Sequence, residues 1–82
     1  MIMRVVDQLP HPTFRIQLFH FGTNYLVEIE AGPMKQTYRY PIDRFPSPAA
    51  VWATVSPEFL ERVHKSFNGM YQDWIATWPP KD

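Results

Sequence analysis

Three histidines are the residues best suited to acid–base or metal chemistry in this chain, and they are scattered. His11 lies between two prolines, His20 in an alternating segment and His64 in a helical pattern, so no two share the i,i+4 spacing of a helical metal site. The sequence contains no cysteine, which excludes disulfides, thiolate nucleophiles and cysteine-bound metals. We therefore predict no metal site and no cofactor.

Hydroxyls and carboxylates form no catalytic pattern either. Neither Ser47 nor Ser56 lies in a Gly-x-Ser-x-Gly elbow, and each precedes a proline, which is typical of a helix start. Glu28 and Glu30 point the same way on one predicted strand, but cations on the neighbouring strand indicate a solvated, charge-paired face. The three glycines are dispersed and form no phosphate-binding loop. We expect no enzyme activity, while a subunit that works only with a partner stays an open alternative.

Aromatic side chains are the strongest remaining signal. The chain has thirteen of them, six Phe, four Tyr and three Trp, which is more than a small two-layer core needs. An apolar spot flanked by two arginines is predicted on the outer face of a sheet, and its residues are Arg15, Phe19, Phe21, Leu26 and Arg39. Aromatic and arginine side chains together are typical of protein interfaces, and also of platforms on which single-stranded nucleic acid stacks.

Three interpretations of this spot stay open. The short helix or the N-terminal segment folds back and covers it; a protein partner covers it, including a second copy in a homodimer; or a single-stranded nucleic acid or small ligand binds there. The function we predict is a small non-catalytic protein-interaction module, with the ligand or nucleic-acid binder as the alternative. The net charge of zero gives no reason to expect duplex nucleic acid and no repulsion against self-association.

The hydropathy of the chain and its N-terminal residues indicate where in the cell the protein is located. No apolar run approaches the roughly 20 residues that span a bilayer, so we expect no membrane insertion. The first seven residues carry charges at Arg4 and Asp7, unlike the apolar segment of a signal peptide. We therefore predict a cytoplasmic protein.

Two matching apolar faces predict one α+β domain over residues 1–82. Alternation of apolar and polar residues over 13–21, 25–31 and 35–40 predicts strands of an antiparallel meander, with glycine-containing turns between them. Residues 2–9 contain strand formers with poor alternation, so the sheet has three or four strands.

The register follows from keeping the apolar residues of the strands on one face. A two-residue first loop and a four-residue second loop achieve this. The inner face then collects Phe14, Ile16, Leu18, Tyr25, Val27, Ile29, Ala31, Tyr38 and Tyr40. On the outer face Glu28 lies near Arg39, which predicts a favourable cross-strand pair.

Two helices complete the predicted fold, a short one over residues 48–54 and a long one over residues 57–77. The phase of the long helix is kept through Gly69, which favours one continuous helix packed on the inner face of the sheet. Its wide apolar stripe consists of Phe59, Leu60, Val63, Phe67, Met70, Tyr71, Trp74, Ile75 and Trp78. Trp74 lies near the middle of this stripe, so we expect it to be buried in the core.

Overall fold

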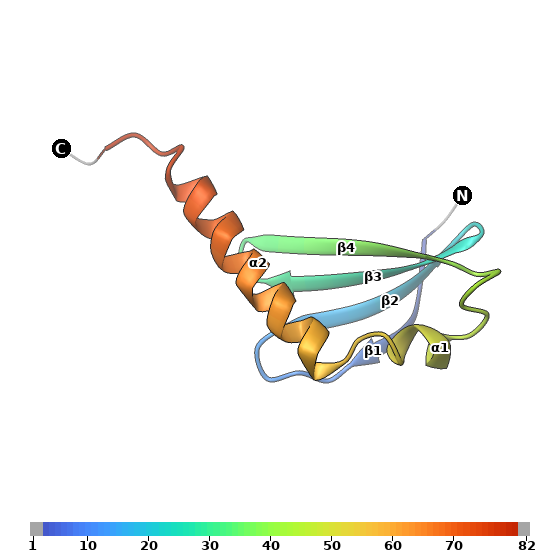
Figure 1. Ribbon diagram of the computed structural model, residues 1–82. Coiled ribbons are helices and arrows are strands. Elements are labelled where there is room, and N and C mark those ends of the chain that lie inside the picture. Colours follow the sequence, from blue (N-terminus) through green and yellow to red (C-terminus); the bar gives the residue numbers. More distant parts are fainter. Residues whose placement is uncertain (1–2, 81–82) are drawn as a thin grey trace.

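A computed structural model describes residues 3–80, and in this range a four-stranded antiparallel sheet precedes two helices (Figure 1). The elements are β1 (Arg4–Leu9), β2 (Arg15–Phe21), β3 (Asn24–Ala31), β4 (Met34–Pro41), α1 (Pro48–Trp52) and α2 (Pro57–Ile75). The strands lie in the order β1-β2-β3-β4. The predicted α+β meander with a long C-terminal helix is confirmed, and β1 is its fourth strand.

The strand pairing keeps the predicted register. Val27 of β3 pairs with Leu18 on one side and with Tyr38 on the other. Gly22 and Gly32 lie in the two hairpin turns with φ values of 61° and 58°, a region that residues with a side chain adopt only with strain. The second turn has two residues instead of the four predicted, because Ala31 and Met34 form one more pair of the ladder at the same register.

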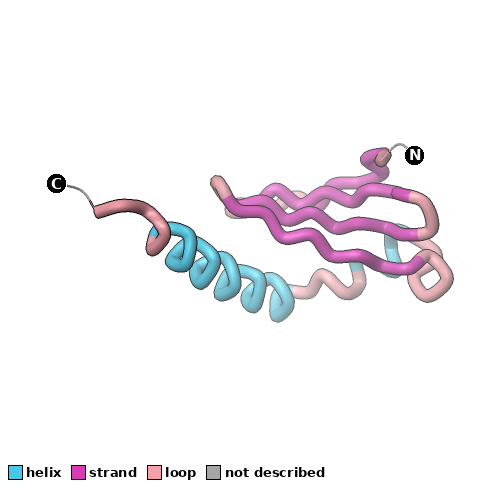
Figure 2. The backbone as a smooth tube through the Cα atoms, turned by 90° about the horizontal axis from the view of Figure 1, so that it is seen from above, coloured by secondary structure: helices cyan, strands magenta, loops and turns pink. Residues whose placement is uncertain are grey.

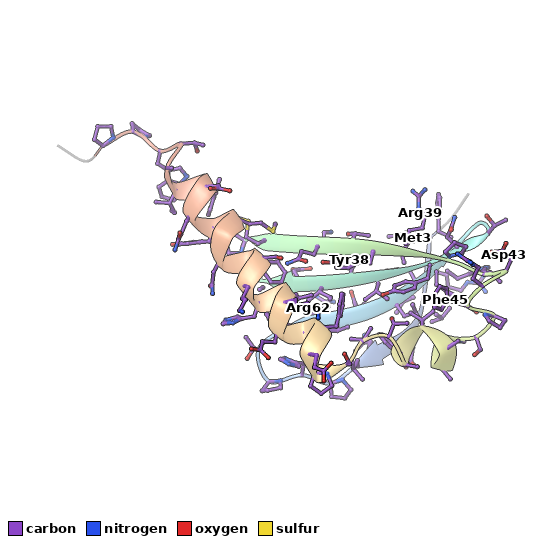
Figure 3. All side chains as sticks on the ribbon, in the orientation of Figure 1. Met3, Tyr38, Arg39, Asp43, Phe45 and Arg62 are labelled. Carbon is purple, nitrogen blue, oxygen red and sulfur yellow. The ribbon has the colours of Figure 1, made fainter. Side chains whose placement is uncertain are left out.

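The core lies between the inner face of the sheet and the two helices. Its buried residues are Phe14, Ile16, Leu18, Val27, Ile29, Val51, Val63 and Phe67. The Tyr38 ring meets Phe59 of α2 edge to face, with 5.2 Å between centroids. The Gln36 side-chain amide donates a hydrogen bond to the carbonyl oxygen of Val63 at 3.1 Å. These contacts attach α2 to β4, and Figure 3 shows Tyr38 and Phe45 on the helix side of the sheet.

Both helices begin where the Ser-Pro steps predict. The Ser47 hydroxyl accepts the N–H of Ala50 at 3.3 Å, and the Ser56 hydroxyl accepts the N–H of Phe59 at 3.1 Å. These bonds satisfy N–H groups that have no partner within the helix. α2 runs through Gly69 without a break, as its apolar phase predicts, and each helix ends two residues earlier than expected.

β1 is an irregular edge strand. Its pairing with β2 shifts at a β-bulge between Val5 and Asp7, which leaves Val6 outside the ladder. Figure 1 shows the start of β1 rising across the ends of the other strands, and Figure 2 places it on the face of the sheet away from α2. The beginning of β1 therefore lies over part of the outer face.

α2 is longer than the sheet is wide. Its 19 residues extend about 28 Å at ~1.5 Å per residue, whereas four strands about 4.8 Å apart span roughly 15 Å. The helix crosses the sheet, and its C-terminal end beyond Met70 projects past it (Figure 1). The molecule is accordingly elongated, with extents of 53 × 31 × 20 Å.

Candidate functional site

The five residues of the predicted outer-face spot fall into two groups. Phe19 pairs with Leu26 across β2 and β3, and Arg39 of β4 pairs with Leu26 from the other side. Phe21 follows two residues along β2 on the same face. Arg15 lies four residues from Phe19, about 13 Å along the strand, in a row with an acidic residue of β3. The structure thus brings four of the five together and leaves Arg15 apart.

The residues of this spot differ in how far they are buried. Phe19 is only 9% exposed, because Val5 of β1 lies opposite it and the start of β1 crosses this face. Leu26 is half-buried, whereas Phe21 is 40% exposed. Figure 3 shows Arg39 pointing away from the helices. The chain's own N-terminal strand therefore covers part of the spot, and Phe21 with the apolar residues of β1 is what stays open.

His11 fixes the loop that precedes β2. Its Nδ1 atom accepts the backbone N–H groups of Thr13 and Phe14, both at 3.1 Å, so the proton of the neutral ring lies on Nε2. The imidazole stacks on Phe14 at 4.8 Å, and His64 of α2 lies 6.2 Å from the same ring. A groove of about 410 Å³ opens beside these rings. Among residues 3–80, no three His, Asp or Glu side chains lie close enough together to hold a metal ion.

Glu28 pairs with Lys35, and not with Arg39 as predicted. The Lys35 Nζ atom lies 3.4 Å from the Glu28 Oε1 atom. The register places Glu28 opposite Thr37, so both cations lie diagonally across from the carboxylate at similar reach. Lys35 makes the ion pair with Glu28. Arg39 lies opposite the apolar Leu26 instead.

A hydrogen bond between Trp52 and Asp7 connects α1 to β1. The indole N–H donates to Asp7 Oδ2 at 2.6 Å, and the backbone N–H of Gln8 donates to Asp7 Oδ1 at 2.8 Å. Both hydrogen bonds stabilise the carboxylate and so hold the pKa of Asp7 below its usual value of 3.8. The bond from the indole has the larger effect, and the bond from the Gln8 backbone the smaller. No local sequence pattern predicts a contact between residues 45 positions apart.

The apolar stripe leaves the sheet after Tyr71, which lines a groove with Ala31 and Met34 where β3 ends and β4 begins. Val63 and Phe67 are buried on the sheet, but Trp74 is 38% exposed, Tyr71 49% and Trp78 53%. The prediction that Trp74 lies in the core is wrong, because α2 has already passed the sheet at this point (Figure 1). We call Tyr71, Trp74 and Trp78 the aromatic end.

The rings of the aromatic end pack on one another. Tyr71 and Trp74 meet edge to face with 6.1 Å between centroids, and Trp74 and Trp78 do so at 5.0 Å. The chain beyond Ile75 keeps helical turns, since the N–H of Trp78 donates to the Ile75 carbonyl oxygen at 3.0 Å. All three rings are therefore presented along one side of the projecting helix.

Charge is distributed unevenly along α2. Residues 57–65 include two acids and two bases, whereas residues 66–78 include a single charged residue, Asp73. Loss of charge together with enrichment in Trp, Tyr and Met is the composition of the buried centre of protein interfaces. This change in charge can be read in the sequence, but it suits a buried core as well as an interface, so exposure of the aromatic end had to come from the structure.

Comparisons with protein-family models, with curated proteins and with solved structures return no match. No helix among residues 3–80 has the length and apolarity to cross a membrane. The surfaces described above are therefore the basis on which a function can be proposed.

Proposed function

We propose that this domain is a small non-catalytic protein-interaction module that binds its partner through the aromatic end. The observation that carries the proposal is the continuity of one apolar stripe, which is buried at Val63 and Phe67 and exposed at the three rings of the aromatic end. Large exposed apolar patches on small proteins mark binding sites. Trp and Tyr are also the residue types that contribute most to binding free energy at interfaces.

The outer face of the sheet gives weaker support for the same function. Phe19 is covered there by the start of β1, which leaves Phe21 as its exposed ring. The single-stranded nucleic-acid alternative needs exposed rings beside cations, but Arg15 lies opposite Glu30, and Glu30 in turn lies opposite Lys35, so acids and bases alternate across this row of the sheet. A net charge of zero adds no attraction for phosphates.

The non-catalytic part of the proposal is supported by how the polar side chains are used. The His11 Nδ1 atom holds a loop, and the Ser47 and Ser56 hydroxyls cap the two helices. These groups are therefore engaged in maintaining the fold. We place the module in the cytoplasm because its core is built without cysteine, which suits a reducing compartment.

A binding comparison tests the proposal. The tagged parent, a Trp74→Ser/Trp78→Ser double variant and a Phe21→Ser control are incubated with extract of the cells that produce the protein. A protein retained by parent and control, but not by the double variant, is then purified and its affinity measured by calorimetry. We expect the double variant to bind at least about tenfold more weakly, as is typical when interface hot spots are lost.

Two outcomes contradict this proposal. If Phe21→Ser abolishes retention while the double variant keeps it, the outer face is the binding surface. If the retained species is a nucleic acid and its binding falls steeply as salt rises, the alternative binder is correct, because phosphate contacts have this salt dependence.

A further inference from the structure

We infer that the partner is a second copy of this chain, bound through the aromatic end in an antiparallel two-fold arrangement. This inference rests on the proposed function and specifies its partner. The surface is 38–53% exposed at each of its three rings, so the rest of the described chain, residues 3–80, leaves it open. Its charge, ring geometry, position and area each favour a second copy.

The aromatic end carries little charge. Asp73 is the single charged residue of positions 66–78, so the surface needs no partner of opposite charge. The chain as a whole has a net charge of zero, and two copies therefore do not repel each other at long range. A two-fold contact uses the same patch on both copies, which is what an uncharged aromatic surface permits.

The spacing of the rings suits antiparallel pairing. Tyr71 and Trp78 lie three residues before and four residues after Trp74, and all three face one side of the helix. With the two-fold axis beside Trp74, Tyr71 of each copy lies near Trp78 of the other. The edge-to-face packing seen within one chain, at 5.0 and 6.1 Å, then extends across the interface.

The projection of α2 gives a second copy access. Figures 1 and 2 both show the C-terminal end of the helix extending beyond the sheet, so two such ends can lie side by side while their sheets stay apart. The three rings expose about 300 Å² per copy, taking 150–250 Å² for a fully exposed ring. A pair then buries roughly 600 Å² of ring surface, which is below the about 1,200–2,000 Å² of stable interfaces and therefore indicates weak, concentration-dependent association.

The sheet edges offer a second copy a poorer contact. β4 carries Lys35, Arg39 and Pro41, and charged residues and proline on an edge strand discourage pairing. Two β4 strands paired antiparallel about Thr37 would place each Lys35 opposite the Arg39 of the other copy. β1, the other edge, is interrupted by its bulge. Pairing through the helix ends avoids both obstacles.

Sedimentation equilibrium of charge variants tests the inference. The parent, Trp74→Glu, Trp74→Lys and the control Phe21→Ser are compared from about 10 µM to about 1 mM, the range in which so small an interface associates. We expect the mass of parent and control to rise from 9.7 kDa toward twice that value. Each Trp74 variant stays monomeric, because two like charges meet at the two-fold axis.

An equimolar mixture of Trp74→Glu and Trp74→Lys provides the decisive measurement. At low salt, where exposed charges are poorly screened, the mixture should associate at least about tenfold more tightly than either variant alone. Circular dichroism of each variant confirms that it is folded. A mixture that stays monomeric, or a Trp74→Glu variant that dimerises like the parent, overturns the arrangement.

The outcome also separates this inference from the proposed function. If the parent is monomeric throughout, and the extract experiment yields a different protein that the Trp74→Ser/Trp78→Ser variant fails to bind, self-association is wrong and the interaction module stands. If the species retained from extract is the untagged chain itself, both are supported.

Discussion

Truncation of Phe67 and of Trp74 tests whether α2 has a packed half and a free half. Phe67 is 5% exposed and lies 5.5 Å from the Phe14 ring in the core. Phe67→Ala leaves a cavity there, and such changes cost about 3–5 kcal/mol. Trp74 is 38% exposed and packs on neighbours that are themselves exposed, so Trp74→Ala loses about 1 kcal/mol of aromatic pairing.

These magnitudes are large relative to the stability of so short a chain. At ~0.05–0.15 kcal/mol per residue the whole domain is stable by about 4–12 kcal/mol. Trp74→Ala should therefore lower the melting temperature by about 4–8 °C, whereas Phe67→Ala should lower it several times more or unfold the protein. The assays are urea unfolding followed by circular dichroism and thermal melting, at low concentration so that association does not add to stability.

Equal losses for Phe67→Ala and Trp74→Ala would refute the division of α2. They would mean that Trp74 is packed within the fold in solution, and the aromatic end would then not exist as a free surface. Trp78→Ala is the matched control, because Trp78 is 53% exposed on the same stripe and should cost no more than Trp74→Ala.

Three further predictions concern the hydrogen bond to Asp7 and two of the glycines. Trp52→Phe removes the indole donor, so the Asp7 pKa should rise toward 3.8 in an NMR titration of its carboxyl group. Because the folded-state pKa of Asp7 is lowered, its contribution to stability is present above the unfolded pKa and is lost as pH falls through the folded pKa. The Trp52→Phe variant should therefore lose less stability than the parent on acidification below pH 3.8. Gly69→Ala should raise the free energy of unfolding by about 1 kcal/mol, because an added Cβ meets nothing within 4 Å in a helix interior. Gly32→Ala should lower the free energy of unfolding by about 1 kcal/mol, although an added Cβ there also meets nothing within 4 Å, because φ is +58°. Thermal melts of the two glycine variants test both predictions. A loss of stability for Gly69→Ala would contradict the open space beside that position of the helix.

The register of the sheet could be predicted because a single pairing keeps Leu18, Val27 and Tyr38 on one face. The partner of Glu28 could not, since two cations lie diagonally across from it and alternation does not distinguish them. The bulge in β1 was also beyond prediction. Its residues alternate poorly, and the turn of the strand over Phe19 depends on contacts distant in sequence.

The periodicity of a helix fixes the direction of each side chain but not the layer that the side chain meets. Trp74 points the same way as Val63 and Phe67, so the pattern predicts burial for all three. Whether that burial occurs depends on the width of the sheet, which the helical segment does not encode. For this reason the fold could be predicted from the sequence, while the exposed aromatic end required the structure.

The bond between Asp7 and Trp52 closes a loop of 45 residues, whereas β2, β3 and β4 are joined by turns of two. β1 is joined to β2 by the five residues 10–14, so chain entropy favours assembly of the four-stranded meander first and docking of α1 onto β1 afterwards. An edge strand that has one neighbour in the sheet and is interrupted by a bulge is expected to be the first to open locally. Because Val5 of β1 lies opposite the buried Phe19, we expect each opening of β1 to uncover Phe19 and make the outer face accessible while the helix-packed core stays folded.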